Sequence, residues 1–254
     1  MSVAVLSPHL DDAVLSAWSV LRRAGPVAVV NVCAGVPPPG PPTRWDSLTG
    51  ARDAAERMHE RLAEDRVALA RAGREAVYLD FLDRQYRSGP IEPDALTRAL
   101  ADAVAGASEL WAPAGIGAHP DHVQVREAAL ALRDDGGPPV RLYAELPYSI
   151  RWGWPEWVSG RRSRDALDVD AWLTSFLPEG TPVPGDPHVL SRAERRRKLR
   201  ALQDYRTQWA ALDAWPQRTM GRRRVIRHEA SYAAGPAAKT AGAAAERSSE
   251  HRIA

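Results

Sequence analysis

Two apolar runs near the N-terminus decide the fold: Val3-Ala4-Val5-Leu6 and Val27-Ala28-Val29-Val30-Asn31-Val32. Pro8 follows the first run and Gly25-Pro26 precedes the second, as is typical of buried strands. Between them, the apolar residues at positions 14, 15, 18 and 21 follow the spacing of a helix over 13–21. A strand, a helix and a strand within about 30 residues form a βαβ unit, which predicts a parallel sheet.

The same alternation continues along the chain. Strands are predicted over 76–79, 109–113 and 140–145, and helices over 52–72, 95–104, 122–133 and 191–209. Repetition of this kind indicates an α/β fold, a three-layer sandwich with a mostly parallel, Rossmann-like sheet. Residues 147–187 are rich in Trp, Pro and Gly and are expected to form mainly loops. We expect one domain over 1–233 and a disordered tail over 234–254, where the composition offers little to bury.

The composition excludes several classes of protein. The chain has 254 residues, and its net charge of +2 is not that of a protein built mainly to coat nucleic acid. A single cysteine excludes an internal disulfide and a thiolate zinc cluster, so a metal site must use His, Asp or Glu. No stretch approaches the roughly 18 apolar residues of a membrane span, and the N-terminus lacks the features of a signal peptide. We therefore expect a cytoplasmic protein.

Two clusters of metal-ligating residue types follow predicted strands. Ser7-Pro8-His9-Leu10-Asp11-Asp12 lies where the first strand meets the first helix, and Ala118-His119-Pro120-Asp121-His122 follows strand 109–113. Together they supply three histidines and three aspartates, and a catalytic zinc takes three such ligands and keeps one position open for water. Each cluster alone also fits an ordinary helix start. Because both lie at strand-to-helix junctions, we predict that they converge on a metal site at the carboxyl edge of the sheet.

These motifs resemble those of a known family. Residues 8–12 together with 119–122 are similar to the PIG-L/LmbE-like zinc-dependent N-deacetylases, whose members remove acetyl groups from N-acetylglucosamine-type sugars. Weaker similarities lie at Arg61-Leu62-Ala63-Glu64, in the segment 198–208 and in the closing segment 228–232. The resemblance implies that zinc is bound by His9, Asp12 and His122, and that Asp121 orients a ligand histidine from outside the metal shell.

The same resemblance implies the other roles at the site. Asp11 would be the general base that activates water, and His119 would face the developing oxyanion and help to protonate the amine. Arg61 and Asp83 match positions that hold sugar hydroxyls. Many members carry Glu after the paired aspartates, where this chain has Ala13, so a substrate assignment taken from those members does not transfer.

The sequence leaves three functions open. The first is a zinc-dependent hydrolase, iron(II) being an alternative metal, that removes the acetyl group from a small N-acetylated amino-sugar conjugate. The second is a metal-dependent hydrolase of another amide bond. The third is a non-enzymatic binder of nucleic acid or an anionic surface through the basic runs 195–198 and 222–224, although these also read as solvated helix faces and we expect no nucleic-acid partner. Trp152 and Trp154 either stack on a sugar ring or cover the core. The oligomeric state stays open.

Overall fold

The computed structural model describes residues 2–149, 185–214 and 226–235, together with residues 172, 173, 175 and 177. Its centre is a seven-stranded sheet in the order β3-β2-β1-β4-β5-β7-β6. The first five strands in chain order are parallel: β1 (Val3–Ser7), β2 (Val27–Asn31), β3 (Ala76–Tyr78), β4 (Glu109–Pro113) and β5 (Val140–Tyr143). The two late strands, β6 (Gly185–Val189) and β7 (His228–Ala233), extend it as an antiparallel edge.

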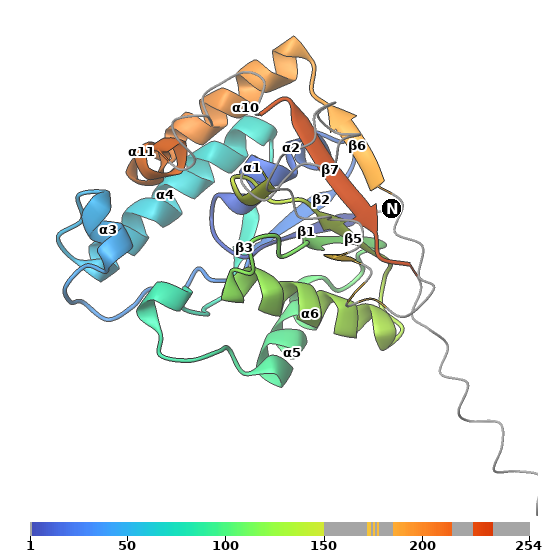
Figure 1. The fold of residues 1–254 in the computed structure, drawn as a ribbon, viewed down its shortest axis with the longest axis horizontal. Coiled ribbons are helices and arrows are strands. Elements are labelled where there is room, and N and C mark those ends of the chain that lie inside the picture. The colour runs from blue at the N-terminus through green and yellow to red at the C-terminus, as the bar shows by residue number, and fades with distance from the viewer. Residues whose placement is uncertain are drawn as a thin grey trace, which may run out of the picture.

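Helices cover both faces of this sheet (Figure 1). One layer holds α5 (Pro93–Ala103) and α6 (Pro120–Asp134), and the other holds α4 (Ala54–Ala72) and α10 (Arg192–Asp204), which pack against each other. Shorter helices complete the described fold: α1 (Asp12–Ser16), α2 (Trp18–Leu21), α3 (Arg44–Leu48), the 3₁₀ turn η1 (Arg84–Tyr86) and α11 (Arg206–Ala214). The predicted three-layer α/β fold with a mostly parallel sheet is confirmed.

Successive side chains of β1 serve the two layers in turn. Ala4 and Leu6 are fully buried in the core on the α5–α6 side, whereas Val5 is fully buried in the core on the α4–α10 side. This alternation explains why the strand is apolar at each position from Val3 to Leu6, since a central parallel strand is covered on both faces.

Two predicted helices are each divided in two. The helix over 13–21 breaks at Ala17, because the Glu229 carboxylate accepts hydrogen bonds from the backbone N–H groups of Trp18 (2.9 Å) and Ser19 (2.8 Å) and so starts a second helix. The helix over 191–209 breaks at Tyr205, and the Glu64 carboxylate then caps α11 through the N–H of Thr207.

Some sequence predictions need correction, and others fall on residues that the structure does not describe. Strands β6 and β7 were not predicted, and β6 begins inside the segment expected to be loop; its Pro187 is tolerated because β6 is an edge strand. Ala234, which the sequence places in the tail, is buried and its N–H bonds to the Val140 carbonyl. Trp152, Trp154, the run 222–224 and residues 236–254 lie outside the described residues.

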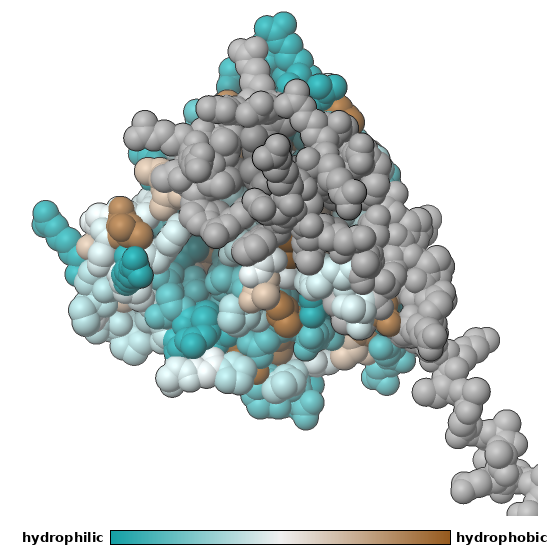
Figure 2. Space-filling model, in the orientation of Figure 1, coloured by the Kyte–Doolittle hydropathy of each residue, from teal (hydrophilic) through white to brown (hydrophobic). Residues whose placement is uncertain are grey.

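One residue of the basic run 195–198 does not reach solvent. Lys198, at the end of the run 195–198, is fully buried, and its ammonium group bonds to Glu229 at 2.6 Å. On the face shown in Figure 2, the described residues are mostly hydrophilic or neutral, and the hydrophobic ones are scattered. None of the described helices has the length and apolar content that crossing a membrane requires.

Candidate metal centre

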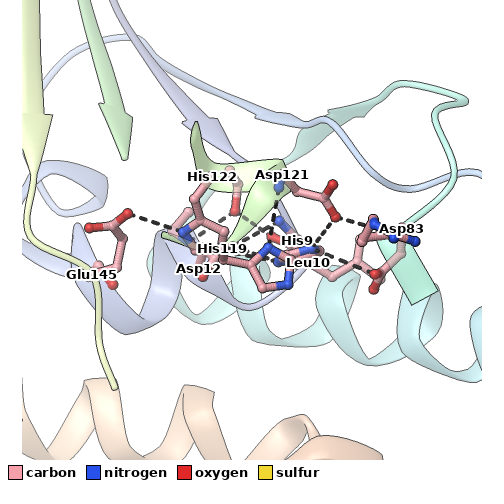
Figure 3. Close-up of polar contacts among 12 residues, drawn as sticks. His9, Leu10, Asp12, Asp83, His119, Asp121, His122 and Glu145 are labelled. Carbon is pink, nitrogen blue, oxygen red and sulfur yellow. Dashed lines mark hydrogen bonds and ion pairs between the residues drawn. The ribbon is translucent and has the colours of Figure 1, made fainter. Parts of the chain in front are cut away.

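The predicted site residues meet at the carboxyl edge of neighbouring strands. His9 and Asp11 lie between β1 and α1, and Asp12 is the first residue of α1. His119 caps α6 after β4, and Asp121 and His122 lie in the first turn of α6. Since β1 and β4 pair directly, two clusters more than 100 positions apart in the sequence come into contact. Figure 3 shows the side chains of both loops converging.

Local hydrogen bonds fix the first loop. The Ser7 hydroxyl donates to the His9 carbonyl (2.6 Å) and accepts from the Ala13 N–H (3.0 Å). The His9 N–H donates to Asp12 Oδ2 at 2.8 Å. These bonds turn the chain sharply after β1 and direct the imidazole and the carboxylate of this loop to the same point.

Three ligand atoms form an almost equilateral triangle at that point. Asp12 Oδ2 lies 3.3 Å from His9 Nδ1 and 3.3 Å from His122 Nε2, and the two ring nitrogens are 3.3 Å apart. Ligands placed tetrahedrally at 2.0–2.1 Å from zinc are separated by about 3.3–3.4 Å. The residues present therefore fit a tetrahedral divalent metal with three protein ligands. A looser grouping of His9, His119 and His122 brings its ligand atoms within 4.8 Å of one another, which fits less closely.

Each of the two ligand imidazoles has a carboxylate on its other nitrogen. His9 Nε2 lies 3.0 Å from Asp121 Oδ2, and His122 Nδ1 lies 3.1 Å from Glu145 Oε1 (Figure 3). Asp121 also accepts from the Arg84 N–H, and Glu145 from the Gly115 N–H, so both carboxylates are held in place. Outer partners of this kind fix the orientation of ligand histidines and raise their basicity.

Glu145 contacts the ligand His122 but is not among the site residues predicted from the sequence. It is fully buried and follows β5 at the same sheet edge as the two motifs. Its position at the end of a predicted strand, 140–145, was a signal for it, because that edge is where the other site residues lie. The backbone that it contacts is unusual: Gly115 has φ 80°, and a Cβ there would lie 2.9 Å from Arg126 Nη1.

Glu145→Gln is expected to weaken metal binding about 10- to 100-fold without removing a direct ligand, because His122 loses its anionic partner. Competition against a chromophoric chelator measures this affinity. Glu127→Gln is the matched control, since the Glu127 side chain is 63% exposed on α6. Equal affinities for the two variants would contradict the role given to Glu145.

Neighbouring carboxylates raise the pKa values of the two histidines in the triangle and so favour a positive charge there. Burial lowers the pKa of His122, but Asp12 and Glu145 outweigh burial and raise that pKa to about 9. Burial also opposes protonation of His9, yet Asp83 and further carboxylates raise the pKa of His9 well above its usual value. Burial tends to raise the pKa of Asp12, but the two imidazoles hold that pKa far below its usual range. The same charges would attract a metal cation.

Asp11 and His119 line a pocket of about 550 Å³ beside the triangle. The His119 side chain caps α6, because its Nδ1 accepts the Asp121 N–H at 3.3 Å. A neutral imidazole that accepts at Nδ1 carries its proton on Nε2. Burial, together with His9 and His122, lowers the pKa of His119 to about 4, so the neutral ring is the form present at neutral pH. His119 thus has the Nε2–H group that a donor to an oxyanion needs.

The pocket has a polar side and an apolar side. Arg61 Nη1 lies 3.4 Å from Asp83 Oδ2 on the polar side, and both side chains are buried. Trp45 was not singled out from the sequence, yet it lines the pocket, and its indole N–H donates to Gln208 Oε1 at 2.7 Å. The apolar lining residues are Leu15, Leu146, Pro147 and Leu212.

Known deacetylases are similar to this chain in sequence and in fold. No family model matches the chain. The 2′-N-acetylparomamine deacetylase of Streptomyces fradiae is 30% identical over an alignment of 184 residues, which covers 66% of this chain and only 61% of that enzyme. The crystal structure of the A40926 pseudoaglycone deacetylase Dbv21 covers 91% of this chain and 96% of its own length, at 26% identity and a TM-score of 0.74. A triple mutant of a deacetylase from teicoplanin biosynthesis covers 92% of this chain and 97% of its own, at 26% identity and a TM-score of 0.73. The chain thus shares its sheet and helices, over nearly its whole length, with enzymes that are themselves deacetylases.

Proposed function

We propose that this protein is a metal-dependent hydrolase that removes the acetyl group from an N-acetylated amino-sugar conjugate and releases acetate. The observation that carries the proposal is the triangle of His9, Asp12 and His122, which adjoins Asp11 and His119 in one pocket. The deacetylase activity named for the similar proteins supports it. Zinc is the metal proposed, and iron(II) is the alternative that His and Asp ligands also accept.

The pocket residues supply the proton transfers for amide hydrolysis. A divalent metal held by the triangle would polarise the amide carbonyl and lower the pKa of water towards about 7. Asp11 accepts a proton from the attacking water while the oxygen of that water bonds to the acetyl carbon. The His119 Nε2–H faces the oxygen on which negative charge develops. The C–N bond then breaks while the nitrogen receives the proton that Asp11 took from the water, with His119 assisting this transfer, and the products are the free amine and acetate.

The polar side of the pocket suits a sugar. The Arg61 guanidinium and the Asp83 carboxylate lie 3.4 Å apart on that side, and we propose that they hold sugar hydroxyls. The similar proteins act on 2′-N-acetylparomamine and on the A40926 pseudoaglycone, as their names state. We therefore propose a substrate in which an N-acetylated sugar is linked to a further group.

Acetate release from a panel of N-acetylglucosaminides, by the zinc-loaded and the iron(II)-loaded protein, tests the proposal. Unrelated N-acetylated amines in the same panel separate a sugar deacetylase from a hydrolase of other amides. Release from at least one sugar conjugate, and its loss on chelation, is expected. A metal-loaded protein that releases no acetate from any sugar conjugate would overturn the proposed activity.

His119→Asn is expected to lower kcat about 10²- to 10³-fold with little change in KM, because the asparagine side chain ends short of the position from which the imidazole Nε2–H donates to the oxyanion. Asparagine keeps a side-chain acceptor for the start of α6, so the helix cap survives. His59→Asn is the control, since His59 lies exposed on α4. Steady-state kinetics on the best substrate of the panel measure both variants, and a wild-type kcat for His119→Asn would rule out the oxyanion role.

A further inference from the structure

A buried carboxyl group lies behind the metal loop and is not part of the pocket lining. Asp65, on α4, is 0% exposed. Its Oδ2 atom accepts hydrogen bonds from Asn31 Nδ2 (2.7 Å) and from the Tyr78 hydroxyl (2.8 Å). The pocket chemistry described above uses none of these three groups.

The other carboxyl oxygen leads to the metal loop. Asp65 Oδ1 lies 2.7 Å from the Tyr205 hydroxyl, and that hydroxyl lies 3.0 Å from the Leu10 carbonyl. Among the described residues, Tyr205 is the donor that reaches this carbonyl. Leu10 stands between the ligand His9 and Asp11, so the position of its carbonyl affects both side chains.

Counting protons decides how the three groups bond. A backbone carbonyl only accepts, and a tyrosine hydroxyl has one proton to donate. If Asp65 were ionised, the Tyr205 hydroxyl could donate its one proton either to Asp65 Oδ1 or to the Leu10 carbonyl. Its contact with the remaining acceptor would then place two oxygen atoms together with no proton between them. If Asp65 carries a proton on Oδ1, it donates to Tyr205, Tyr205 donates to Leu10, and Oδ2 keeps its two donors. Only the protonated form makes all four hydrogen bonds, which is what a fully buried site requires.

We propose that Asp65 is a neutral acid that donates through Tyr205 to the Leu10 carbonyl, and that this chain positions the loop carrying His9, Asp11 and Asp12. Asp65 and Tyr205 are positioning residues in this scheme, because neither touches the pocket. The effect on turnover rests on the proposed deacetylase function, whereas the protonation of Asp65 does not.

The surroundings of Asp65 agree with a neutral acid. Burial raises the pKa of Asp65 to about 7, against the opposing hydrogen bonds from Tyr205, Tyr78 and Asn31. The charge of Asp11 raises the pKa of Asp65 further. The guanidinium of Arg66 stacks over the Tyr78 ring, with Cζ 5.2 Å from the ring centroid.

Asp65→Asn and Tyr205→Phe test the two parts of the proposal. The asparagine amide places an N–H where the protonated carboxyl has its O–H, so Asp65→Asn is expected to keep kcat within about threefold of wild type. Tyr205→Phe breaks the link to Leu10, and the resulting loop shift is expected to lower kcat about 10- to 100-fold at an unchanged KM. Tyr78→Phe is the matched control: it removes a hydroxyl from the same carboxyl group but not from Leu10, so kcat should not change. A wild-type kcat for Tyr205→Phe, or a large loss for Asp65→Asn, would overturn the proposal.

Denaturant unfolding as a function of pH tests protonation without any substrate. The pKa of Asp65 is about 7 in the folded protein and about 4 in the unfolded chain. The protonated carboxyl therefore stabilises the fold at low pH, and this stabilisation is lost as the pH rises from about 4 through 7. Compared with Asp65→Asn, the wild type should therefore lose about tenfold in folding equilibrium constant for each pH unit between 5 and 6.5. Parallel pH profiles for the two proteins would show that Asp65 is ionised in the fold and would refute the proposal. If the protein released no acetate at all, this measurement would still decide the protonation of Asp65.

Discussion

Asp11→Asn is expected to keep the metal and to lose turnover about 10²- to 10⁴-fold, which is the range that a general base contributes. The substitution preserves the shape of a side chain that is only 7% exposed and lies outside the ligand triangle. An amide cannot take the proton of the attacking water, whereas the three ligand atoms stay as they are. Elemental analysis of the purified variant and its kcat on the best sugar conjugate measure the two effects separately.

The opposite result is expected for His122→Ala, which makes it the matched comparison. This variant loses one corner of the triangle and should lose bound metal, while Asp11 stays in the pocket. Metal at full occupancy in His122→Ala would contradict the ligand set. Wild-type turnover in Asp11→Asn would refute its role as the base and leave the ligand set untouched.

Lys198→Ala is expected to destabilise the fold by about 3–5 kcal/mol, because it leaves a buried carboxylate without its cation. The Lys198 ammonium lies 2.6 Å from Glu229 Oε1, and the two side chains are 0% and 5% exposed. Glu229 also caps α2 through Trp18 and Ser19, so its charge and its position both matter. Denaturant unfolding followed by tryptophan fluorescence gives the free energy of unfolding.

Two comparisons isolate the buried pair. Lys198→Met combined with Glu229→Gln removes both charges, and it should cost less than Lys198→Ala because no buried ion is left unpaired. Arg71→Ala removes one partner of the exposed pair with Asp204 and should change stability little. A loss in Lys198→Ala no larger than that in Arg71→Ala would mean that Glu229 finds another partner or solvent.

The parts of the fold that could be predicted are those set by local patterns. The runs at 3–6 and 27–32 are apolar at nearly every position, so they identify central strands and the parallel sheet without any knowledge of their partners. The motifs containing Asp12 and His122 could be placed together because the carboxyl ends of adjacent parallel strands share one edge.

The parts that could not be predicted depend on contacts between distant residues. The break between α1 and α2 is made by Glu229, which lies 211 positions from Trp18. The break at Tyr205 accompanies its bonds to Asp65 and to the Leu10 carbonyl, 140 and 195 positions away. Neither breakpoint is marked by Gly or Pro, so the helical pattern runs through both in the sequence.

The cap that Glu229 places on α2 has a consequence for biosynthesis. The loop with His9 and Asp12 leaves the ribosome before the strand that completes the helix pair behind it, because that strand is translated more than 200 residues later. During translation, the early βαβ unit therefore exists with the α2 start uncapped and Lys198 unpaired. The metal centre is thus expected to mature late, after release of the C-terminal strand, and a nascent chain stalled before residue 229 should bind metal weakly.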